Sequence, residues 1–131
     1  MYFVEVRESS GRGRGVFALK NFKKGDVIEV CPIVYISQKE DLNIQETILG
    51  KYIYEWREND GAIILGYGSI YNHSFAPNAT YSRDFKNITL VYKAWKKIGK
   101  GDEIFVNYNG NPRDKNPVDD FLPIDEPLRK K

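Results

Sequence analysis

Apolar and polar residues alternate along several short segments of this chain, and an alternation with a period of two residues predicts strands. The predicted strands cover residues 2–6, 15–18, 27–36, 62–65, 79–82, 87–95 and 103–108. Pro32 interrupts the third strand or places it at a sheet edge, because proline cannot donate a hydrogen bond to a neighbouring strand. Short strands at this density predict a mostly β fold.

A helical period occurs once, near residues 44–57. Apolar side chains there follow the i, i+4 spacing of one helix face: Ile48, Leu49, Tyr52, Ile53 and Trp56. Asn43 and Glu46 fit a capping box at its start, whereas Gly50 inside the helix costs about 1 kcal/mol relative to alanine. We therefore expect one short helix.

One heptapeptide is echoed later in the chain. Lys24–Val30 has the sequence Lys-Gly-Asp-Val-Ile-Glu-Val, and Lys100–Val106 has the sequence Lys-Gly-Asp-Glu-Ile-Phe-Val. In each copy a Gly-Asp turn begins an alternating strand. Two copies do not make a repeat array, so the echo predicts two similar corners within one all-β framework.

The composition changes after Asn109, where four prolines stand among charged residues. No linker-like stretch precedes this point. We therefore expect one domain over residues 1–110 and an extended tail over residues 111–131. Within the tail, Phe121 is the only aromatic residue, and an apolar pair with Leu122 favours a segment that docks rather than one that is solvated.

Composition excludes several classes of protein. Of 131 residues, 41% are hydrophobic and 29% charged, which is a globular balance. The chain lacks the long apolar run of a membrane span, and its first residues lack the pattern of a signal peptide. With Cys31 as the only cysteine and His73 as the only histidine, we expect no disulfide, no metal site and an intracellular location.

Three segments could carry chemistry, and each also has a plain structural interpretation. Gly11–Gly15 contains three glycines that allow close backbone approach to a ligand, or simply form a flexible turn. The polar segment Asn72–Asn78 either caps turns or surrounds a polar ligand. Tyr108 ends the last predicted strand, where tyrosines are usually core or interface residues.

Taken together and in this order, these segments resemble the ordered motifs of SET domains. The resemblance is carried by the glycine turn with Val-Phe-Ala (Gly11–Ala18), by Asn-His-Ser-x-x-Pro-Asn (Asn72–Asn78), and by Gly-Asp-Glu-Ile-x-x-x-Tyr (Gly101–Tyr108). Ile64–Tyr71 looks like the corresponding stretch of the minimal viral and microbial members. The resemblance covers residues 3–110. It implies a β-clip of small sheets, with a C-terminal segment threaded through a preceding loop as a pseudoknot.

The resemblance also implies protein-lysine methyltransferase activity with S-adenosyl-L-methionine as cofactor, S-adenosyl-L-homocysteine as product, and no metal. Tyr108 matches the catalytic tyrosine. The implied cofactor-binding residues are Arg12, Gly13, Arg14, Gly15, Asn72 and His73. Apart from the resemblance, the apolar pair in the tail predicts that Phe121 either folds back onto the cofactor or packs on the outer surface or in a dimer contact. Tyr81 and Tyr71 are expected to line the substrate channel.

The chain departs from the family pattern at several positions. It has no cysteine-rich flanking segments, Asn107 replaces an acidic residue before the tyrosine, and Phe75 stands where cysteine is frequent. The alternative interpretation is therefore a catalytically weak SET-like module that binds a protein partner.

The expected partner is a lysine-containing protein substrate, such as a histone or another basic protein, and a homodimer is compatible with the sequence. Direct nucleic-acid binding is not expected, because the net charge is only +2 and the basic residues are scattered in fragments.

Overall fold

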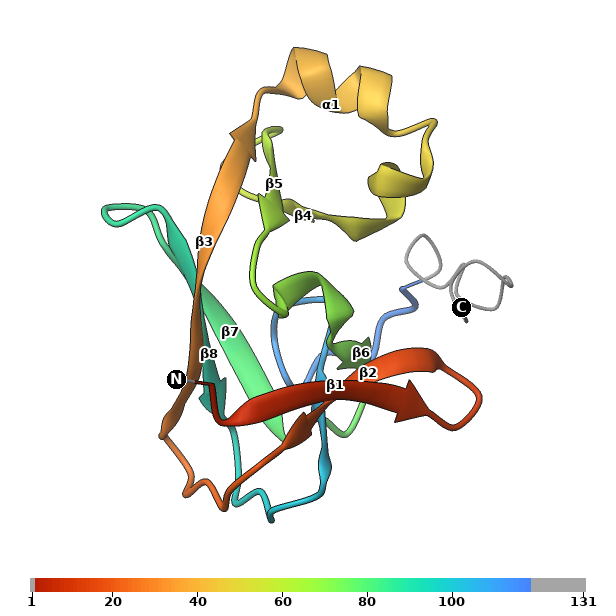
Figure 1. The fold of residues 1–131 in the computed structure, drawn as a ribbon. Coiled ribbons are helices and arrows are strands. Elements are labelled where there is room, and N and C mark those ends of the chain that lie inside the picture. Colours follow the sequence, from red (N-terminus) through yellow and green to blue (C-terminus); the bar gives the residue numbers. More distant parts are fainter. Residues whose placement is uncertain (1, 119–131) are drawn as a thin grey trace.

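The computed structural model describes residues 2–118, and two small curled sheets form its framework (Figure 1). The four-stranded sheet has the order β1 (Val4–Ser9), β2 (Gly13–Ala18), β9 (Glu103–Val106) and β6 (Asn72–His73). The five-stranded sheet has the order β4 (Ile53–Glu55), β5 (Gly61–Ile64), β3 (Val27–Ile36), β8 (Thr89–Ala94) and β7 (Ala79–Asp84). The predicted mostly β fold is confirmed.

The late strand β9 lies between β2 and β6, so segments from the beginning, middle and end of the chain become neighbours. β9 pairs antiparallel with β2, and it pairs parallel with β6 through Asn72 opposite Phe105 and His73 opposite Val106. A late strand inserted between earlier ones is the arrangement that the predicted threaded C-terminal segment requires. It brings three of the sequence motifs to one place.

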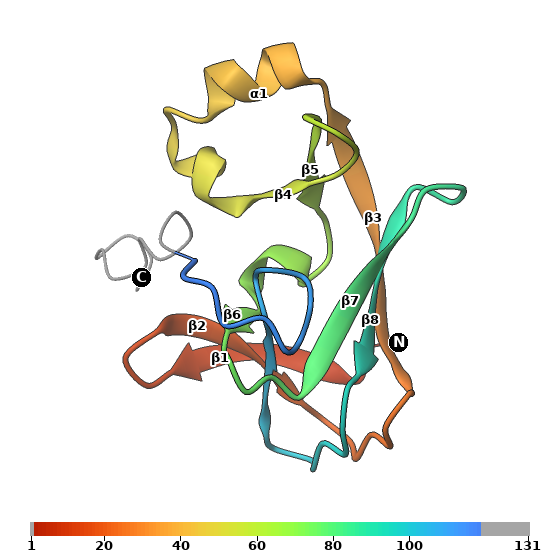
Figure 2. The ribbon, with the colours of Figure 1, turned by 180° about the vertical axis from the view of Figure 1, so that it is seen from behind.

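β3 is the centre of the larger sheet, and it pairs with β8 through its first half and with β5 through its second half (Figure 2). Its side chains alternate, so that Cys31 is fully buried whereas Val30 and Val34 are about half exposed. Leu90 and Tyr92 of β8 complete the same core with no exposed surface. Burying each such side chain stabilises the fold by about 1.5–3 kcal/mol.

The helix predicted near residues 44–57 is wrong. The α-helix is α1 (Gln38–Ile44), and the predicted segment instead contains a 3-10 helix, η1 (Ile48–Tyr52), followed by β4. Serine and glutamate at positions 37 and 40 form the capping box, in place of the predicted pair at 43 and 46.

The glycine at position 50 lies at a close backbone contact. A Cβ at Gly50 would lie 2.6 Å from the carbonyl oxygen of Gln45, so the turn that follows α1 leaves no room for a side chain at this position. A second 3-10 helix, η2 (Gly68–Ile70), precedes β6. Among the described residues, no helix has the length and apolar character needed to cross a membrane.

The two echoed corners have the same conformation. Gly25 and Gly101 have φ values of +93° and +94°, in the region that favours glycine. In each corner the aspartate that follows accepts a backbone N–H three residues earlier, with Asp26 bound to Lys23 at 2.8 Å and Asp102 bound to Gly99 at 2.9 Å. The corners also bind each other, because Phe22 and Ile98 exchange backbone hydrogen bonds of 2.8 and 3.0 Å.

The described residues after β9 contain two turns, in which the N–H of Gly110 donates to the carbonyl of Asn107 and the N–H of Asp114 donates to that of Asn111. The buried Asn107 side chain donates to the carbonyl of Asp114 (2.7 Å) and accepts from the N–H of Asn109 (2.9 Å). Val118 is buried, so the segment continues the packed structure beyond the expected boundary at residue 110. Phe121 and its predicted contact with the cofactor lie outside the described residues.

Candidate functional site

Two adjacent hollows meet at Tyr108. The first, called here the tyrosine pocket, has a volume of about 190 Å³ and is lined by Lys51, Tyr52, Ile53, Tyr54, Glu55, Ser69, Tyr71, Tyr81, Arg83, Tyr108 and Asn109. The second, called the arginine pocket, is narrower, about 20 Å³, and is lined by Arg12, Arg14, Tyr52, Ser69, Ile70, Asn72 and Tyr108. Three residues belong to both: Tyr52, Ser69 and Tyr108. A ligand in one pocket can therefore face a ligand in the other beside Tyr108.

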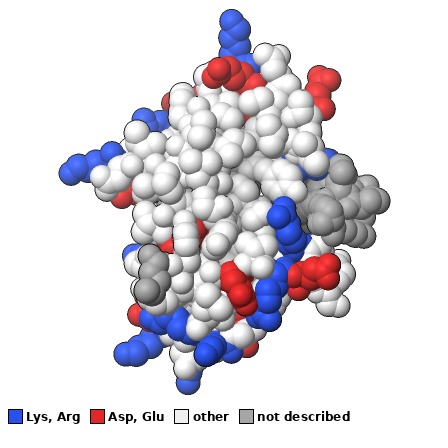
Figure 3. All heavy atoms as spheres, in the orientation of Figure 1, with Lys and Arg blue, Asp and Glu red and all other residues white. Residues whose placement is uncertain are grey.

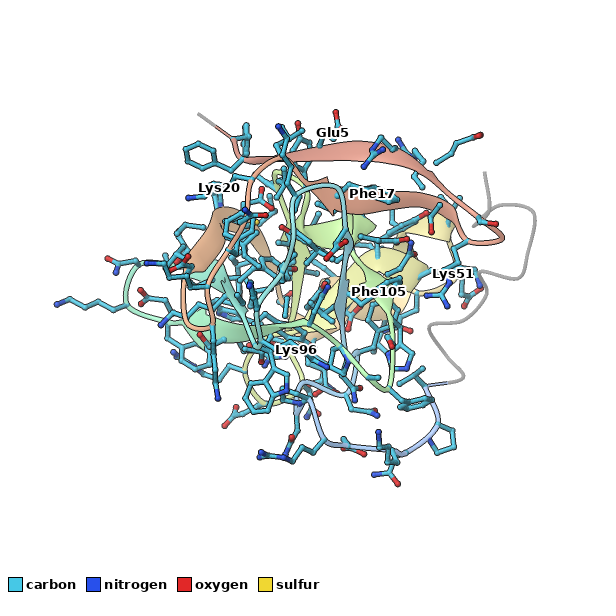
Figure 4. All side chains as sticks on the ribbon, turned by 90° about the horizontal axis from the view of Figure 1, so that it is seen from below. Glu5, Phe17, Lys20, Lys51, Lys96 and Phe105 are labelled. Atoms are coloured by element: carbon cyan, nitrogen blue, oxygen red, sulfur yellow. The ribbon has the colours of Figure 1, made fainter. Side chains whose placement is uncertain are left out.

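The tyrosine pocket has neutral aromatic walls. Burial raises the pKa of Tyr54 and of Tyr71 well above the ordinary value, and it raises the pKa of Tyr81 to about 12. These side chains consequently remain uncharged phenols at neutral pH. Charged groups among the lining residues come from Lys51 (labelled in Figure 4), Glu55 and Arg83.

Tyr54, which lines this pocket, is paired with the buried Tyr92. The hydroxyl oxygens of Tyr54 and Tyr92 lie 3.0 Å from each other and each 3.0 Å from the carbonyl oxygen of Gly68. A Cβ at Gly68 would collide with the side chain of Ile64, so the close approach of η2 to β5 requires glycine. The hydroxyl of Tyr54 is therefore held in the pocket by a hydrogen bond with the backbone.

Tyr108 is held at three points. Its hydroxyl donates to the carbonyl of Tyr71 at 2.8 Å, and its backbone N–H donates to Nδ1 of His73 at 3.0 Å. Its own carbonyl accepts from the hydroxyl of Tyr81 at 3.3 Å. The strand end that carries Tyr108 is thus fixed to β6 and β7 before any ligand binds.

His73 is left with one buried, unpartnered atom. Because Nδ1 accepts a hydrogen bond, the ring proton of the neutral imidazole is on Nε2. Within residues 2–118, Nε2 is buried and has no hydrogen-bond partner. Burial and the nearby Arg12 guanidinium lower the pKa of His73, so the ring is neutral at pH 7. A buried N–H donor without a partner points to a missing acceptor at this site.

Asn72 is oriented by a carboxylate that sequence reasoning missed. Its side-chain nitrogen donates to the carbonyl of Arg14 (2.9 Å) and to Oε2 of Glu103 (2.8 Å). Ser9 donates to the other oxygen of Glu103 at 2.6 Å. Both protons of the Asn72 amide are therefore used, which leaves its oxygen as an acceptor. A Cβ at Gly15 would collide with the Glu103 carboxylate, so this close packing requires glycine.

The predicted cofactor residues near the glycine turn lie in two groups. Arg12 and Arg14 line the arginine pocket, and Arg12 also donates to the carbonyl of His73 at 3.3 Å. The Arg12 guanidinium lies 4.8 Å from the ring centre of Phe105 on β9 (labelled in Figure 4). Gly13 (φ +76°) and Gly15 shape the backbone of β2, and neither lines the pocket.

Behind the tyrosine pocket lies a buried carboxylate. Glu29 is 5% exposed and accepts hydrogen bonds from the hydroxyl of Tyr71 (2.8 Å) and from the N–H of Tyr67 (3.0 Å). The pKa of the neighbouring Cys31 is raised by burial and by the charge of Glu29. Glu29 thus fixes the side chain of Tyr71, and the carbonyl of Tyr71 accepts from the hydroxyl of Tyr108.

The structure brings together most of the predicted site. The side chains that line a pocket are Arg12, Arg14, Asn72, Tyr71, Tyr81 and Tyr108. The residues that sequence reasoning missed are Tyr52, Tyr54, Ser69, Glu29 and Glu103. A signal for some of these was present, since nine tyrosines are many for 131 residues. Within residues 2–118, no group of three or more metal-binding side chains comes together.

Comparison with known proteins identifies the family. The family model described as the SET domain matches residues 13–109. The chain belongs to the SET domain family. The match spans the second part of the glycine turn, the segment 72–78 and the strand that leads to Tyr108, so the family resemblance read from the sequence is confirmed.

A curated relative and a solved structure are both named as histone methyltransferases, the second as a candidate. The Schizosaccharomyces pombe protein named histone-lysine N-methyltransferase, H3 lysine-37 specific, is 33% identical over 106 residues, which are 80% of this chain and 72% of the relative. A crystal structure of a Plasmodium falciparum protein, named as a candidate histone methyltransferase, is 36% identical with a TM-score of 0.69, covering 82% of this chain and 94% of that one. These likenesses place the chain among protein-lysine methyltransferases.

A more distant neighbour supports the fold alone. A chain of Polycomb Repressive Complex 2 from Chaetomium thermophilum, in a structure bound to S-adenosylmethionine, is 21% identical with a TM-score of 0.71. The match covers 84% of this chain and 15% of that one. The same two-sheet framework therefore occurs inside a much longer protein.

Proposed function

We propose that this protein transfers a methyl group from S-adenosylmethionine to the side-chain amine of a lysine in a basic protein. The observation that carries the proposal is the position of Tyr108, which lines both the tyrosine pocket and the arginine pocket. Methyl transfer needs the donor and the amine on opposite sides of one narrow opening, because the displacement is in line. Two hollows that share Tyr108 fit this need.

The residues of the arginine pocket fit the cofactor. The free oxygen of Asn72 can accept from an ammonium group. His73 lines neither pocket, but it follows Asn72 in β6, and its Nε2 offers a buried donor beside the arginine pocket. The guanidinium groups of Arg12 and Arg14 are suited to a carboxylate. When bound, S-adenosylmethionine supplies a methyl group already activated on a sulfonium.

The tyrosine pocket would prepare the lysine. A free lysine has a pKa of about 10.4, so deprotonation at pH 7 costs about 4–5 kcal/mol. Neutral aromatic walls remove water from the ammonium group and so lower its pKa, and a cationic neighbour lowers it further. The carbonyl of Tyr71 and the hydroxyl of Tyr108, 2.8 Å apart, provide oxygens at the opening.

Charge beside the tyrosine pocket favours a basic substrate. A further hollow of about 510 Å³ shares Lys51, Ile53, Tyr54 and Glu55 with that pocket. Its acidic lining residues are Asp41, Glu55, Glu58 and Asp60. Basic residues next to the target lysine would find complementary charge there. A histone or another basic intracellular protein is the proposed substrate class.

The decisive experiment has two steps. Titration calorimetry with S-adenosylmethionine first tests cofactor binding by the purified protein. Incubation with isotopically labelled cofactor, purified histones and a cell extract then tests transfer, and mass spectrometry identifies the labelled side chain. We expect label on lysine and a strong loss with Tyr108→Phe. Cofactor binding without transfer to any protein would leave a SET-like binding module, and absence of binding would refute the proposal.

A further inference from the structure

The two echoed corners form a basic surface that the sequence shows only as fragments. Each corner carries three lysines, and all six are exposed: Lys20, Lys23, Lys24, Lys96, Lys97 and Lys100. The mutual backbone hydrogen bonds of Phe22 and Ile98 join the corners, and the N–H of Lys100 also donates to the side chain of Asn21 at 2.8 Å. We refer to these six lysines as the basic corner surface.

The surface concentrates charge far beyond the average of the chain. Residues 20–26 and 96–102 each contain three lysines and one aspartate, so together they carry +4, whereas the whole chain carries +2. The two aspartates, Asp26 and Asp102, accept backbone N–H groups inside their own turns. Within residues 2–118, none of the six lysines forms an ion pair with a carboxylate. Their charges are therefore available to an external anion.

The location of the surface separates it from the candidate active site. The corners form the lower end of the molecule in Figure 1, and α1 forms the upper end. Figure 3 shows basic side chains gathered along this lower end. Lys20 and Lys96, labelled in Figure 4, come from the two different corners. None of the six lysines lines the tyrosine pocket or the arginine pocket, so an anion bound here leaves both pockets open.

We propose that the basic corner surface binds the phosphate backbone of duplex nucleic acid without reading its sequence. Duplex DNA presents one negative charge per about 1.7 Å of axis, which suits a cluster of unpaired ammonium groups. Lysine acts as a point charge toward phosphate, with no bidentate reading of bases.

The aromatic rings near the surface argue for a duplex rather than a single strand. Stacking of single-stranded bases needs a free aromatic face. The Lys24 ammonium and the Arg113 guanidinium lie 6.0 and 5.1 Å from the ring centre of Trp95, and the Lys20 ammonium lies 4.8 Å from that of Phe3. Cations thus already occupy these rings. The proposal concerns a second binding surface and does not depend on methyl transfer.

The test is fluorescence anisotropy with a labelled 30-base-pair duplex of arbitrary sequence, over a series of salt concentrations. The variant Lys23→Gln with Lys97→Gln removes one lysine from each corner. The control Lys39→Gln with Lys86→Gln removes the same charge from exposed positions in α1 and in the turn between β7 and β8. At 0.1 M salt we expect the dissociation constant to rise at least about fivefold in the corner variant and less than about twofold in the control.

The salt dependence provides a second readout. The logarithm of the binding constant falls with the logarithm of the salt concentration, and each lost phosphate contact makes this slope less steep by about 0.9. The slope of the corner variant should therefore be less steep by about one to two. Circular dichroism and cofactor titration confirm that both variants fold. Equal losses in the two variants, or no duplex binding by the native chain at 50 mM salt, would overturn the proposal. So would a polyglutamate peptide that binds as tightly and loses affinity in the same variant, because the surface would then recognise acidic protein.

Discussion

At the scale of single residues, the hydrogen bonds of His73 and Asn72 show which of their atoms are free to bind a ligand. His73 accepts with Nδ1 and keeps a buried donor on Nε2, while Asn72 donates both amide protons and keeps its oxygen. One donor and one acceptor are therefore left for a ligand. Glu103 fixes the side-chain amide of Asn72, and the backbone N–H of Tyr108 fixes the ring of His73.

Tyr108→Phe removes one hydroxyl and its 2.8 Å hydrogen bond to the carbonyl of Tyr71. We expect methyl transfer to fall at least about tenfold, which corresponds to 1.4 kcal/mol of transition-state stabilisation. The cofactor dissociation constant should change little, because the backbone contact with His73 remains. Single-turnover rates measured beside calorimetric affinities check this. Unchanged turnover would assign Tyr108 to packing alone.

Glu103→Ala removes the acceptor that fixes the Asn72 amide. The freed amide can rotate and present the wrong atom, so we expect the cofactor to bind at least about fivefold more weakly, a loss near 1 kcal/mol. Glu103→Gln keeps a side-chain oxygen and should recover most of the affinity. The readout is the Michaelis constant for cofactor against that for the protein substrate. A glutamine variant as weak as the alanine variant would contradict a positioning role.

At the scale of elements, local turn chemistry could be predicted from the sequence, whereas the position of the helix could not. The Gly-Asp corners form as expected because φ near +93° requires glycine, and an aspartate side chain closes the turn. The helix at 38–44 has no buried residue, so it leaves no apolar stripe to find. The stripe at 48–56 belongs instead to a 3-10 helix and a strand, where Ile48 and Leu49 are about half exposed.

Gly25→Ala and Gly101→Ala test the equivalence of the two corners. No atom lies within 4 Å of the added Cβ at either position, so the cost comes from the backbone alone. We expect each variant to lose about 1–2 kcal/mol of unfolding free energy, with similar values at both sites. Urea denaturation provides the comparison, and Gly50→Ala, which meets the backbone of Gln45, serves as a contrasting case. A large cost at one corner only would show that the echo is superficial.

At the scale of the whole molecule, the site exists because of topology. The motifs at 12–15, 72–73 and 103–108 meet through the insertion of β9 between β2 and β6. No local pattern in the sequence specifies this pairing, and the family resemblance supplied it. The same limit hid Tyr54 and Glu29, whose roles arise from packing between β3, β4 and η2. Likewise, the two lysine clusters are far apart in the sequence, and the pairing of Phe22 with Ile98 brings them together.

The buried tyrosines predict a specific loss of stability in alkali. The pKa values of Tyr54, Tyr71 and Tyr92 are raised well above 10 by burial, and that of Tyr81 is raised to about 12. Unfolded tyrosines lose their protons near pH 10, so the folded state binds more protons above that pH. Stability is therefore complete below pH 10 and falls as pH rises, by up to about 1.4 kcal/mol per pH unit for each tyrosine.

Urea denaturation at pH 8, 10 and 11 measures this slope. Tyr92→Phe should be less stable at pH 8, because its hydroxyl contacts are lost, and should show a shallower decline above pH 10. A native stability that is flat between pH 10 and 11 would exclude the effect.

The rate at which an alkylating reagent labels Cys31 measures how often the folded protein opens. Cys31 is the only thiol of the chain, it has no exposed surface, and burial with the charge of Glu29 suppresses its thiolate. An alkylating reagent can therefore reach it only when the central strand separates from its neighbours, and each labelled molecule records one such opening by a single mass increment. Because Glu29 of this strand accepts from the hydroxyl of Tyr71, we expect the openings that expose the thiol also to disturb Tyr71, whose carbonyl accepts from Tyr108. Cofactor at ten times its dissociation constant should then slow labelling about tenfold.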